Sequence, residues 1–392
     1  GNILSKIYLE AAAEAGYEIN NDMNGYKQEG FGLMDTTIFD GKRQSTSVTY
    51  LHPIKQRQNL TLITNIQVSK IIIENSSAIG VEIKNKNKLE KIFIEKEVLL
   101  SAGAINSPQI LMLSGVGPEE ELKNHGINVI SALNGVGENL QDHLETYVQY
   151  ECTKPVTLYS SFNPINMALI GMQWFLFKKG IAAHSNLEIG GFIRTNEMVD
   201  YPNMQYHFFP SLVIDHGRQN PSCHAFQAHV GPMRPTSRGF VKLKSSNPID
   251  SPRIQFNYMQ TEHDLNEMRE GIEIARNIFH QKAFDHYRGK EISPGENINS
   301  DDGLNNFIRS KGDTAYHPSC TCKMGNDDMS VVDQNLKVYG VEKLRVVDAS
   351  IMPNIVSGNL NATTVMIAEK ASDLIQNKIT AEKVNIEFYK AS

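Results

Sequence analysis

The sequence predicts an α/β domain split into two segments, with an α+β domain built on an antiparallel sheet inserted between them. Three features of the 392 residues support this prediction. A β-branched run at 59–100 ends in small residues before a helix, residues 144–260 alternate like antiparallel strands, and residues 344–376 return to a buried strand followed by a helix. Two α/β segments on either side of an antiparallel block indicate an insertion.

The first α/β segment is expected to contain short strands followed by a helix. The strand candidates are Leu60–Ile63, Val68–Ile73, Ile79–Ile83, Lys91–Ile94 and Val98–Leu100. The last strand meets Ser101, Ala102, Gly103 and Ala104, and a helix then follows with Ser107 as its N-cap, Pro108 in its first turn and Gly115 at its end. Small residues between a strand and a helix allow a ligand to approach the backbone closely.

The middle block is expected to form an antiparallel sheet with helices on one side. Its strand candidates are Gln205–Phe209, His224–Val230, Gly239–Lys244 and Arg253–Asn257, and a helix is predicted over His263–His280. The last segment has a buried strand at 344–347 with Asp348 at its tip, and a helix over Ala362–Gln376. The N-terminus of that helix faces the intervening loop, an arrangement that favours anion or cofactor binding.

Composition and charge exclude several classes of protein. A net charge of −6 argues against nucleic-acid binding. No apolar run approaches the roughly 18 residues of a transmembrane helix, and the start of the chain lacks the basic and apolar regions of a signal peptide. The four unevenly spaced cysteines favour a reducing compartment, so a cytoplasmic location is expected.

Residues 317–325, HPSCTCKMG, raise three possibilities: a metal site, a redox pair, or a catalytic histidine in a loop that also contains cysteine. Zinc sites need four ligands, and one histidine with Cys320 and Cys322 falls short. A thioredoxin-like pair needs two residues between its cysteines, and here there is one. We therefore expect no metal and two buried cysteines. Two interpretations of His317 remain at this point: a loop histidine satisfied by the backbone, which is the commoner role of an isolated histidine, and a catalytic residue.

Four stretches in order resemble the glucose–methanol–choline family of flavin-dependent alcohol oxidoreductases. They are SAGAINSPQILMLSGVGP at 101–118, GVGENLQDH at 135–143, YHPSCTCKMG at 316–325 and LRVVDASIMPNIVSGNLNATTVMIAEKASDLI at 344–375. EAAAEAGY, NGYKQEGFG and SNLEIGGFIR resemble the choline dehydrogenase branch, as does Cys320 in place of the family's usual glycine. The resemblance extends from Ile3 to about Gln376 and implies FAD as cofactor.

One motif of that family is absent from the sequence. The strand, Gly-rich loop and helix that cradle the dinucleotide pyrophosphate, G-x-G-x-x-G, do not occur. The expected explanation is that the chain lacks roughly the first third of the enzyme and binds flavin poorly by itself. An inactive fragment without flavin is accordingly an alternative to an enzyme.

The resemblance gives the segments their expected roles. Residues 1–58 would link to the missing N-terminal part and cover the substrate site. Residues 59–143 and 313–380 would be the middle and C-terminal parts of the FAD-binding domain, 144–312 the substrate-binding domain, and 381–392 a tail.

The resemblance implies two catalytic residues. Oxidation of an alcohol removes the hydroxyl proton and a hydride, and His317 matches the histidine that accepts the proton. Asn361 follows at 361 − 317 = 44 positions and would hydrogen-bond the alkoxide or the flavin. The simple structural role of Asn361 is to cap the following helix. Asn139, Gln141, Asp142 and His143 are expected to organise a loop near the cofactor, without a catalytic role for His143.

The same resemblance implies cofactor-binding and substrate-binding residues. The cofactor-binding candidates are Ser101, Ala102, Gly103, Asp348, Ala349, Asn359, Ala362 and Thr363. Glu188 matches an acid that would bind the trimethylammonium group of choline, and Trp174, Phe192, Tyr206 and Phe208 are candidates for an aromatic cage. The structural alternatives are a strand-end acid for Asp348, tight packing at 101–104 and a solvated acid for Glu188.

The expected reaction is oxidation of choline to betaine aldehyde, with further oxidation to glycine betaine as an extension. The expected partners are choline and a respiratory electron acceptor, with no nucleic acid and at most peripheral association with the inner membrane. An oxidoreductase for another primary alcohol is the alternative within the family.

Overall fold

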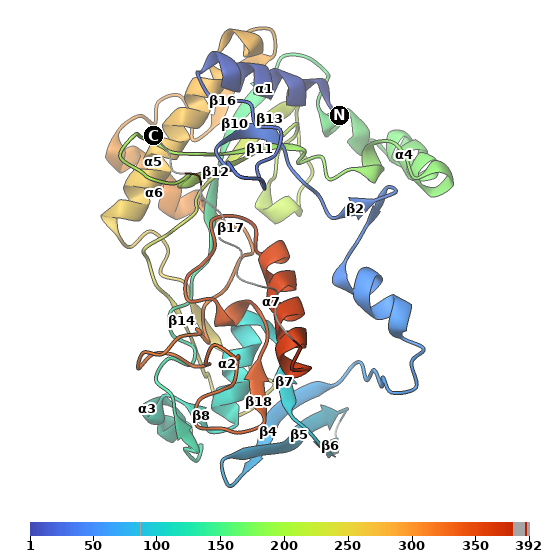
Figure 1. Ribbon diagram of the computed structural model, residues 1–392. Helices are drawn as coiled ribbons and strands as arrows, with labels where there is room; N and C mark the ends of the chain where they lie inside the picture. The colour runs from blue at the N-terminus through green and yellow to red at the C-terminus, as the bar shows by residue number, and fades with distance from the viewer. Residues whose placement is uncertain (87, 379–388, 390–392) are drawn as a thin grey trace.

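The computed structural model describes residues 1–86, 88–378 and 389, and it has two parts joined by several chain crossings (Figure 1). The predicted tail at 381–392 lies outside the described residues apart from residue 389. One part is built on a large antiparallel sheet, and the other contains the short parallel strands and most of the buried loops. A fold in two parts was predicted.

The large sheet has the strand order β1-β11-β12-β13-β10-β16, with β17 paired to one end of β10. Every neighbouring pair is antiparallel. The bounds are Gly30–Leu33 (β1), Leu144–Cys152 (β10), Ile189–Ile193 (β11), Met204–Phe209 (β12), Ala225–Pro232 (β13), Arg288–Ser293 (β16) and Asp313–Thr314 (β17).

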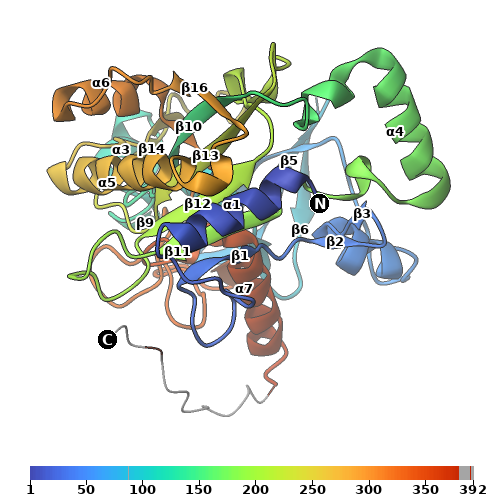
Figure 2. The same cartoon turned by 90° about the horizontal axis from the view of Figure 1, so that it is seen from above.

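Helices cover one face of this sheet. They are α1 (Ile3–Glu14), α5 (Glu262–Phe279) and α6 (Asp301–Lys311), and their apolar side chains form one core with the sheet. Because side chains alternate along a strand, Tyr206 and Phe208 face these helices, whereas Gln205 and His207 face the opposite side. Figure 2 shows α1 and α5 lying across the strands.

The first 33 residues belong to the antiparallel part, which differs from the predicted link at 1–58. Leu4 and Tyr8 of α1 are fully buried in its core, and β1 forms an edge of the sheet. Residues 1–33 are therefore a structural component of the antiparallel part, and the stretch that follows β1 runs over the outside of the molecule (Figure 1).

The second part contains a meander of β4 (Gln67–Glu74), β5 (Ser77–Asn85) and β6 (Lys88–Phe93), together with the parallel pair β7 (Val98–Leu100) and β18 (Leu344–Val346). The pairing of β7 with β18 joins segments far apart in the sequence, so the α/β part is split as predicted. The helices here are α2 (Gly103–Leu113), α3 (Glu119–Asn124) and α7 (Leu360–Ile375).

Two small strand pairs complete this part. They are β8 (Val116–Gly117) with β9 (Ser131–Ala132), and β14 (Phe240–Lys242) with β15 (Arg253–Gln255). Leu243, just after β14, is buried in the core of the α/β part. The stretch around 240–255 therefore packs away from the large sheet, although the predicted boundaries placed it in the 144–312 block.

The remaining elements are short or peripheral. They are β2 (Ile38–Phe39), β3 (Lys42–Arg43), α4 (Pro164–Phe177), a π-helix at Ser47–Leu51, and 3₁₀ turns at His52–Ile54, Leu158–Phe162, Ile181–Ala183, Asp215–Gly217, Lys282–Phe284 and Ala349–Ile351. The strand predicted at Leu60–Ile63 is absent, because this segment finds no neighbouring strand to pair with.

Helix α2 begins at Gly103, five residues earlier than predicted. Ser107 is not its N-cap: the Ser107 hydroxyl donates to Asp348 at 2.6 Å, and the same carboxylate accepts from the Gly103 amide at 3.0 Å. Asp348 at the tip of β18 thus caps α2 from across the parallel pair. The predicted end is confirmed by Gly115, which has a φ of 83°.

Pro108 lies inside α2 and leaves one carbonyl of that helix without its usual partner. The free carbonyl belongs to Ala104, and the buried Thr321 hydroxyl donates to it at 2.6 Å. The HPSCTC loop is therefore attached to the helix at the position where proline interrupts its hydrogen bonding.

Candidate active site

His317 lies in the loop after β17, where the antiparallel part meets the N-terminal end of α7 (Figure 1). Three neighbours fix its position. Its backbone amide donates to Asp142 at 2.8 Å, its Nδ1 lies 3.0 Å from Nδ1 of His143, and its Nε2 lies 3.4 Å from Nδ2 of Asn359. The loop histidine is therefore held at its backbone and at both ring nitrogens.

The hydrogen bonds of His143 determine which ring nitrogen of His317 carries the proton. Nε2 of His143 lies 3.0 Å from the Met233 carbonyl, which can only accept, so this nitrogen is protonated. Burial and the neighbouring His317 lower the pKa of His143 to about 3, so the ring is neutral and its Nδ1 accepts. His317 must then donate from Nδ1, which leaves its Nε2 unprotonated.

The protonation state of His317 also suits proton acceptance. Burial lowers the pKa of His317 below its usual value, against the opposing effect of the carboxylates of Asp142 and Glu145. The ring is therefore neutral at pH 7, and its lone pair is on Nε2, on the side of the Asn359 amide.

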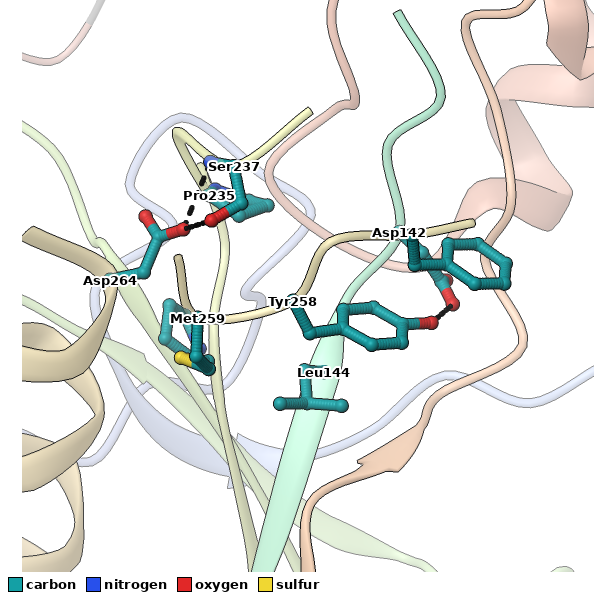
Figure 3. A pocket seen from close by; sticks show the side chains of 9 residues that line it. Asp142, Leu144, Pro235, Ser237, Tyr258, Met259 and Asp264 are labelled. Atoms are coloured by element: carbon teal, nitrogen blue, oxygen red, sulfur yellow. Dashed lines mark hydrogen bonds between the residues drawn. The ribbon is translucent and has the colours of Figure 1, made fainter. Parts of the chain in front are cut away.

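Asp142 joins the histidine loop to the antiparallel part. Its carboxylate accepts from the hydroxyls of Tyr258 and Thr314, each at 2.5 Å, as well as from the His317 amide. Burial raises the pKa of this carboxyl, and these hydrogen bonds oppose the change. Figure 3 shows the Tyr258 hydroxyl pointing at the Asp142 carboxylate. A second acid, Asp264, lies on the other side of the view and accepts from the Ser237 hydroxyl.

The cavity among these residues has a volume of about 10 Å³, which is room for roughly one water molecule. It therefore cannot be the substrate site. Two of the surrounding groups, Tyr258 and Asp142, instead help to fix the backbone of His317 through the hydrogen bonds described above.

The structure pairs His317 with Asn359 rather than with the predicted Asn361. Asn359 immediately precedes α7, and its Oδ1 accepts from Gln205 of β12 at 2.9 Å, so its amide is oriented with Nδ2 toward the histidine. Asn361 lies in the first turn of α7 with an exposed side chain, and no hydrogen bond joins it to His317. Asn359 had been expected to bind the cofactor.

The inner face of the large sheet presents a buried polar cluster next to this site. His229 Nδ1 lies 2.9 Å from the carboxylate of Glu145, and its Nε2 lies 2.8 Å from the amide of Gln227. His207 lies 3.3 Å from Gln205, and burial lowers the pKa of His207 to about 4. The interaction with His229 and His207 holds the pKa of Glu145 below its usual value, although burial opposes this. Glu145, which is half-buried, is thus a second negative charge near His317, in addition to the buried Asp142.

Sequence reasoning missed most of this supporting set. Alternation along β10, β12 and β13 was the available signal, because it places the polar residues of three strands on one face. GVGENLQDH was recognised as a loop near the site, but the contact of His143 with His317 was not anticipated.

Glu188 immediately precedes β11 and borders a cavity of about 780 Å³. Its carboxylate lies 3.6 Å from His184, and its carbonyl accepts from the Met34 amide at 2.8 Å. The other lining residues are Gly1, Leu33, Thr36, Ile38, Asp40, Gly41, Lys178, Lys179, Gly180, Ala183 and Ser185. The acid therefore borders a space large enough for a small alcohol.

The aromatic residues considered for a cage around the substrate do not gather at Glu188. Tyr206 and Phe208 belong to the core on the opposite side of the sheet, where Phe208 stacks on Tyr8 and Tyr206 contacts Phe31, so they do not line the cavity that Glu188 borders. Trp174 donates to the Gly41 carbonyl at 2.7 Å, beside the cavity, and Phe192 is buried near Gly358.

The predicted cofactor-binding residues form two groups. Ser101 and Ala102 are exposed at the tip of β7, and a Cβ added to Gly103 would meet nothing within 4 Å, so open space lies beside this turn. Asp348 is buried and fully engaged with α2 and the Ser350 amide, which supports its structural role. Next to Asp348 and Ala349, the buried Ser350 hydroxyl has no partner among the described residues.

The second group lies at the start of α7, where Ala362 is exposed and Thr363 half-buried in the first turn. Backbone amides of this turn have no acceptor within the helix. Open space at one strand tip, an unpartnered buried hydroxyl and a helix N-terminus are features that fit a dinucleotide cofactor carrying phosphates and a polar ring.

Cys320 and Cys322 are fully buried, as predicted, with free thiols. Their backbone amides donate to the carbonyls of Ala349 and Ser350, so the histidine loop pairs with the turn after β18. Cys320 has a φ of 76°, a left-handed conformation that favours glycine. This explains why glycine is the family's usual residue at this position.

Comparisons with known proteins agree with these features. Two family models described as GMC oxidoreductase match residues 1–145 and 235–368. The mitochondrial choline dehydrogenase of Mus musculus is 51% identical over 389 residues, covering 99% of this chain and 65% of the relative. The oxygen-dependent choline dehydrogenase of Acinetobacter baumannii (strain AYE) is 50% identical over 395 residues, covering 100% of this chain and 72% of the relative.

Solved structures with the same fold include two oxidases. Pyridoxine 4-oxidase from Mesorbium loti has a TM-score of 0.85 at 27% identity, covering 96% of this chain and 70% of that chain. A formate oxidase has a TM-score of 0.89 at 25% identity, covering 95% and 70%. The chain thus spans about two thirds of the length of the proteins it matches. With half of its residues shared with these dehydrogenases along its whole length, the chain belongs to the GMC oxidoreductase family.

Proposed function

We propose that this chain carries the proton-accepting and substrate-binding side of an FAD-dependent oxidation of choline to betaine aldehyde. The observation that supports this most directly is the neutral His317 ring, whose Nε2 is free to accept a proton because Nδ1 is committed to His143. The names of the similar dehydrogenases support choline as the substrate.

In this proposal, Nε2 of His317 takes the hydroxyl proton of the alcohol as the carbinol carbon loses a hydride. Bound FAD would supply the acceptor for that hydride. The amide of Asn359 already donates toward Nε2, so it is placed to stabilise the alkoxide oxygen that approaches the same nitrogen. Asn361 would serve from the first turn of α7 if its side chain turned toward the same oxygen.

The proposed cofactor site joins the tip of β7 to the start of α7. Ser101, Ala102 and Gly103 would leave room for the adenosine portion, and the Ser350 hydroxyl would find a polar partner on the cofactor. Ala349, Ala362 and Thr363 would contribute backbone amides near the phosphates or the ring. Asp348 would hold the two strand tips in place rather than contact the cofactor.

The proposed substrate site uses negative charge on the inner face of the sheet. A quaternary ammonium has no N–H donors, so it is recognised by carboxylate charge and by aromatic faces. Glu188 would provide that charge at the cavity, and the half-buried Glu145 would add to the negative potential around His317. The antiparallel part would accordingly be the substrate domain inserted into the FAD-binding domain.

The wider cellular role follows from the same proposal. Electrons would pass from FAD to a respiratory acceptor, and betaine aldehyde would be oxidised further to glycine betaine. The site of action would be the cytoplasm, with peripheral association at the inner membrane.

Choline-dependent dye reduction by the enzyme that carries this chain tests the assignment. His317→Ala should abolish turnover, and Glu188→Gln should raise the KM for choline at least tenfold. The matched substrate is 3,3-dimethylbutan-1-ol, which has the shape of choline without its charge, and its KM should not change in Glu188→Gln. Unchanged choline KM in Glu188→Gln would exclude the substrate role of this acid, and full turnover in His317→Ala would exclude the base.

A further inference from the structure

Helix α4 (Pro164–Phe177) exposes apolar side chains on the face that points away from the molecule. None of its residues is buried, and none is charged. Asn166, Ile170 and Trp174 recur every fourth residue and are half-buried, so they form the face that contacts the rest of the protein. Both views show α4 at the outer edge of the molecule, beside β2 (Figures 1 and 2).

The opposite face is an apolar stripe. Ile165, Leu169, Met172 and Leu176 lie at i, i+4, i+7 and i+11, and their exposed fractions are 74%, 53%, 52% and 60%. Phe175 lies beside the stripe and is 72% exposed. A surface helix normally presents polar residues to water, so this orientation indicates a face that is covered by something apolar.

Basic side chains surround the C-terminal end of this stripe. Lys178 and Lys179 follow α4, and the Lys178 ammonium lies 3.8 Å from the ring centroid of Trp174. The hydrogen bond from Trp174 to Gly41 places Lys42 and Arg43 of β3 beside the same end, both exposed. Asp40 is the acid of that hairpin, so these five side chains carry a net charge of 4 − 1 = +3.

We propose that the outer face of α4, with Lys42, Arg43, Lys178 and Lys179, is the surface that docks on an anionic phospholipid bilayer. An apolar stripe with lysines at its edge and an aromatic ring near its end is the composition of a helix that lies in the membrane interface. The proposal names the surface for the peripheral association proposed above and does not depend on the choline assignment.

The length of α4 and the charge of its surroundings favour this occupant. Fourteen residues rise about 21 Å, less than the roughly 30 Å of a bilayer core, and within residues 1–86 and 88–378 no helix is long and apolar enough to span. A second copy of the chain is less suitable, because a symmetric contact would bring the two basic clusters together. Anionic headgroups instead complement them.

The membrane face and the candidate substrate cavity share residues. Asp40, Gly41, Lys178 and Lys179 line the cavity that Glu188 borders. Docking through α4 would therefore place the opening of this cavity next to the lipid headgroups.

The full chain is mixed with vesicles of phosphatidylcholine, with or without phosphatidylglycerol, and the vesicles are floated. We expect flotation with the anionic vesicles and weaker binding at high salt.

The test variant is Leu169→Gln/Met172→Gln/Leu176→Gln, which should bind the anionic vesicles at least about tenfold more weakly. The matched control, Leu89→Gln/Phe93→Gln, changes equally exposed apolar residues of β6 and should bind like the parent. Lys42→Gln/Lys179→Gln should lose the preference for anionic vesicles.

Two results would overturn the proposal: the parent chain failing to float, or the triple variant floating as well as the control. Sedimentation of the chain without lipid can give a third result that would overturn it. A dimer that the triple variant abolishes would assign α4 to contact with a second copy instead.

Discussion

His143 and His317 face each other through their Nδ1 atoms, 3.0 Å apart, and only one of the two nitrogens can carry a proton. The Met233 carbonyl fixes the proton of His143 on Nε2, so the proton between the rings belongs to His317. His143 therefore acts as a positioning residue, and it sets the tautomer of the proposed base without contacting the substrate.

Replacement of His143 should impair catalysis through that tautomer. In His143→Phe the Nδ1 acceptor of residue 143 is lost. His317 can then carry its own proton on Nε2, the nitrogen that must be unprotonated to accept the hydroxyl proton of the alcohol. We expect kcat to fall by about 10²-fold, which is at the lower end of what a general base contributes, because only part of His317 would have an unprotonated Nε2. His143→Asn, which keeps a polar acceptor, should recover part of this loss. Nitrogen-15 chemical shifts of His317 check the tautomer directly, and unchanged shifts in His143→Phe would contradict the account.

The low pKa of His317 predicts the pH profile. The neutral ring is the active form, so activity should rise with pH through an apparent pKa below the usual value of about 6.5. Asp142 and Glu145 oppose that shift, so removing the charge of Glu145 should move the profile to still lower pH. Glu145→Gln is the test, and the profile of kcat/KM is the measurement. Movement to higher pH in this variant would show that Glu145 acts otherwise.

Buried neutral histidines should make the fold sensitive to acid. His143 and His207 have pKa values of about 3 and about 4, whereas in the unfolded chain both titrate near 6.5. The unfolded chain therefore binds more protons below pH 6.5, and stability present above that pH is lost as the pH falls toward 4. The change in urea midpoint between pH 7 and pH 4.5 should be smaller in His207→Gln than in the parent. Equal changes would show that His207 does not contribute.

The sequence predicted the architecture better than the side-chain pairing. Val98–Leu100 was recognisable as a short apolar run before small residues, and the strand at 344–346 as a run rich in aliphatic residues that ends at Asp348. Their parallel pairing was not predicted. Leu60–Ile63 is also rich in aliphatic residues, but it does not form a strand, because no other strand lies next to it. The residue pattern within one segment cannot show whether a partner strand is present.

The pairing of His317 with Asn359 could not be predicted for a different reason. Asn359 and Asn361 stand on either side of the start of α7, and each helical residue turns the side-chain direction by about 100°. The spacing of 44 positions does not show in which direction the Asn361 side chain points. The hydrogen bond from Gln205 to Asn359, which is visible only in the folded structure, orients the Asn359 amide toward His317. The polar cluster around Glu145 was missed similarly, because it is assembled from three strands.

The link between Thr321 and Ala104 predicts a large effect from a small change. Thr321→Val keeps the shape of the side chain but removes the hydroxyl that satisfies the carbonyl freed by Pro108. A buried carbonyl without a partner should cost about 1–3 kcal/mol of unfolding free energy. The control is Thr364→Val, which removes a hydroxyl that donates to the carbonyl of Leu360 in α7. Because that carbonyl is an ordinary helical acceptor, the control should cost less than about 1 kcal/mol of unfolding free energy. Urea denaturation measures both variants.

The left-handed backbone of Cys320 predicts an order of stabilities. Alanine at this position keeps the conformational strain and loses the buried thiol, whereas glycine loses the thiol but removes strain of roughly 1–2 kcal/mol. Cys320→Gly should therefore be more stable than Cys320→Ala. Cys322 is equally buried, and its φ is not positive, so there the order should reverse, with Cys322→Ala above Cys322→Gly by about 0.5–1 kcal/mol. Urea midpoints of the four variants decide the matter, and the same order at both positions would exclude strain at Cys320.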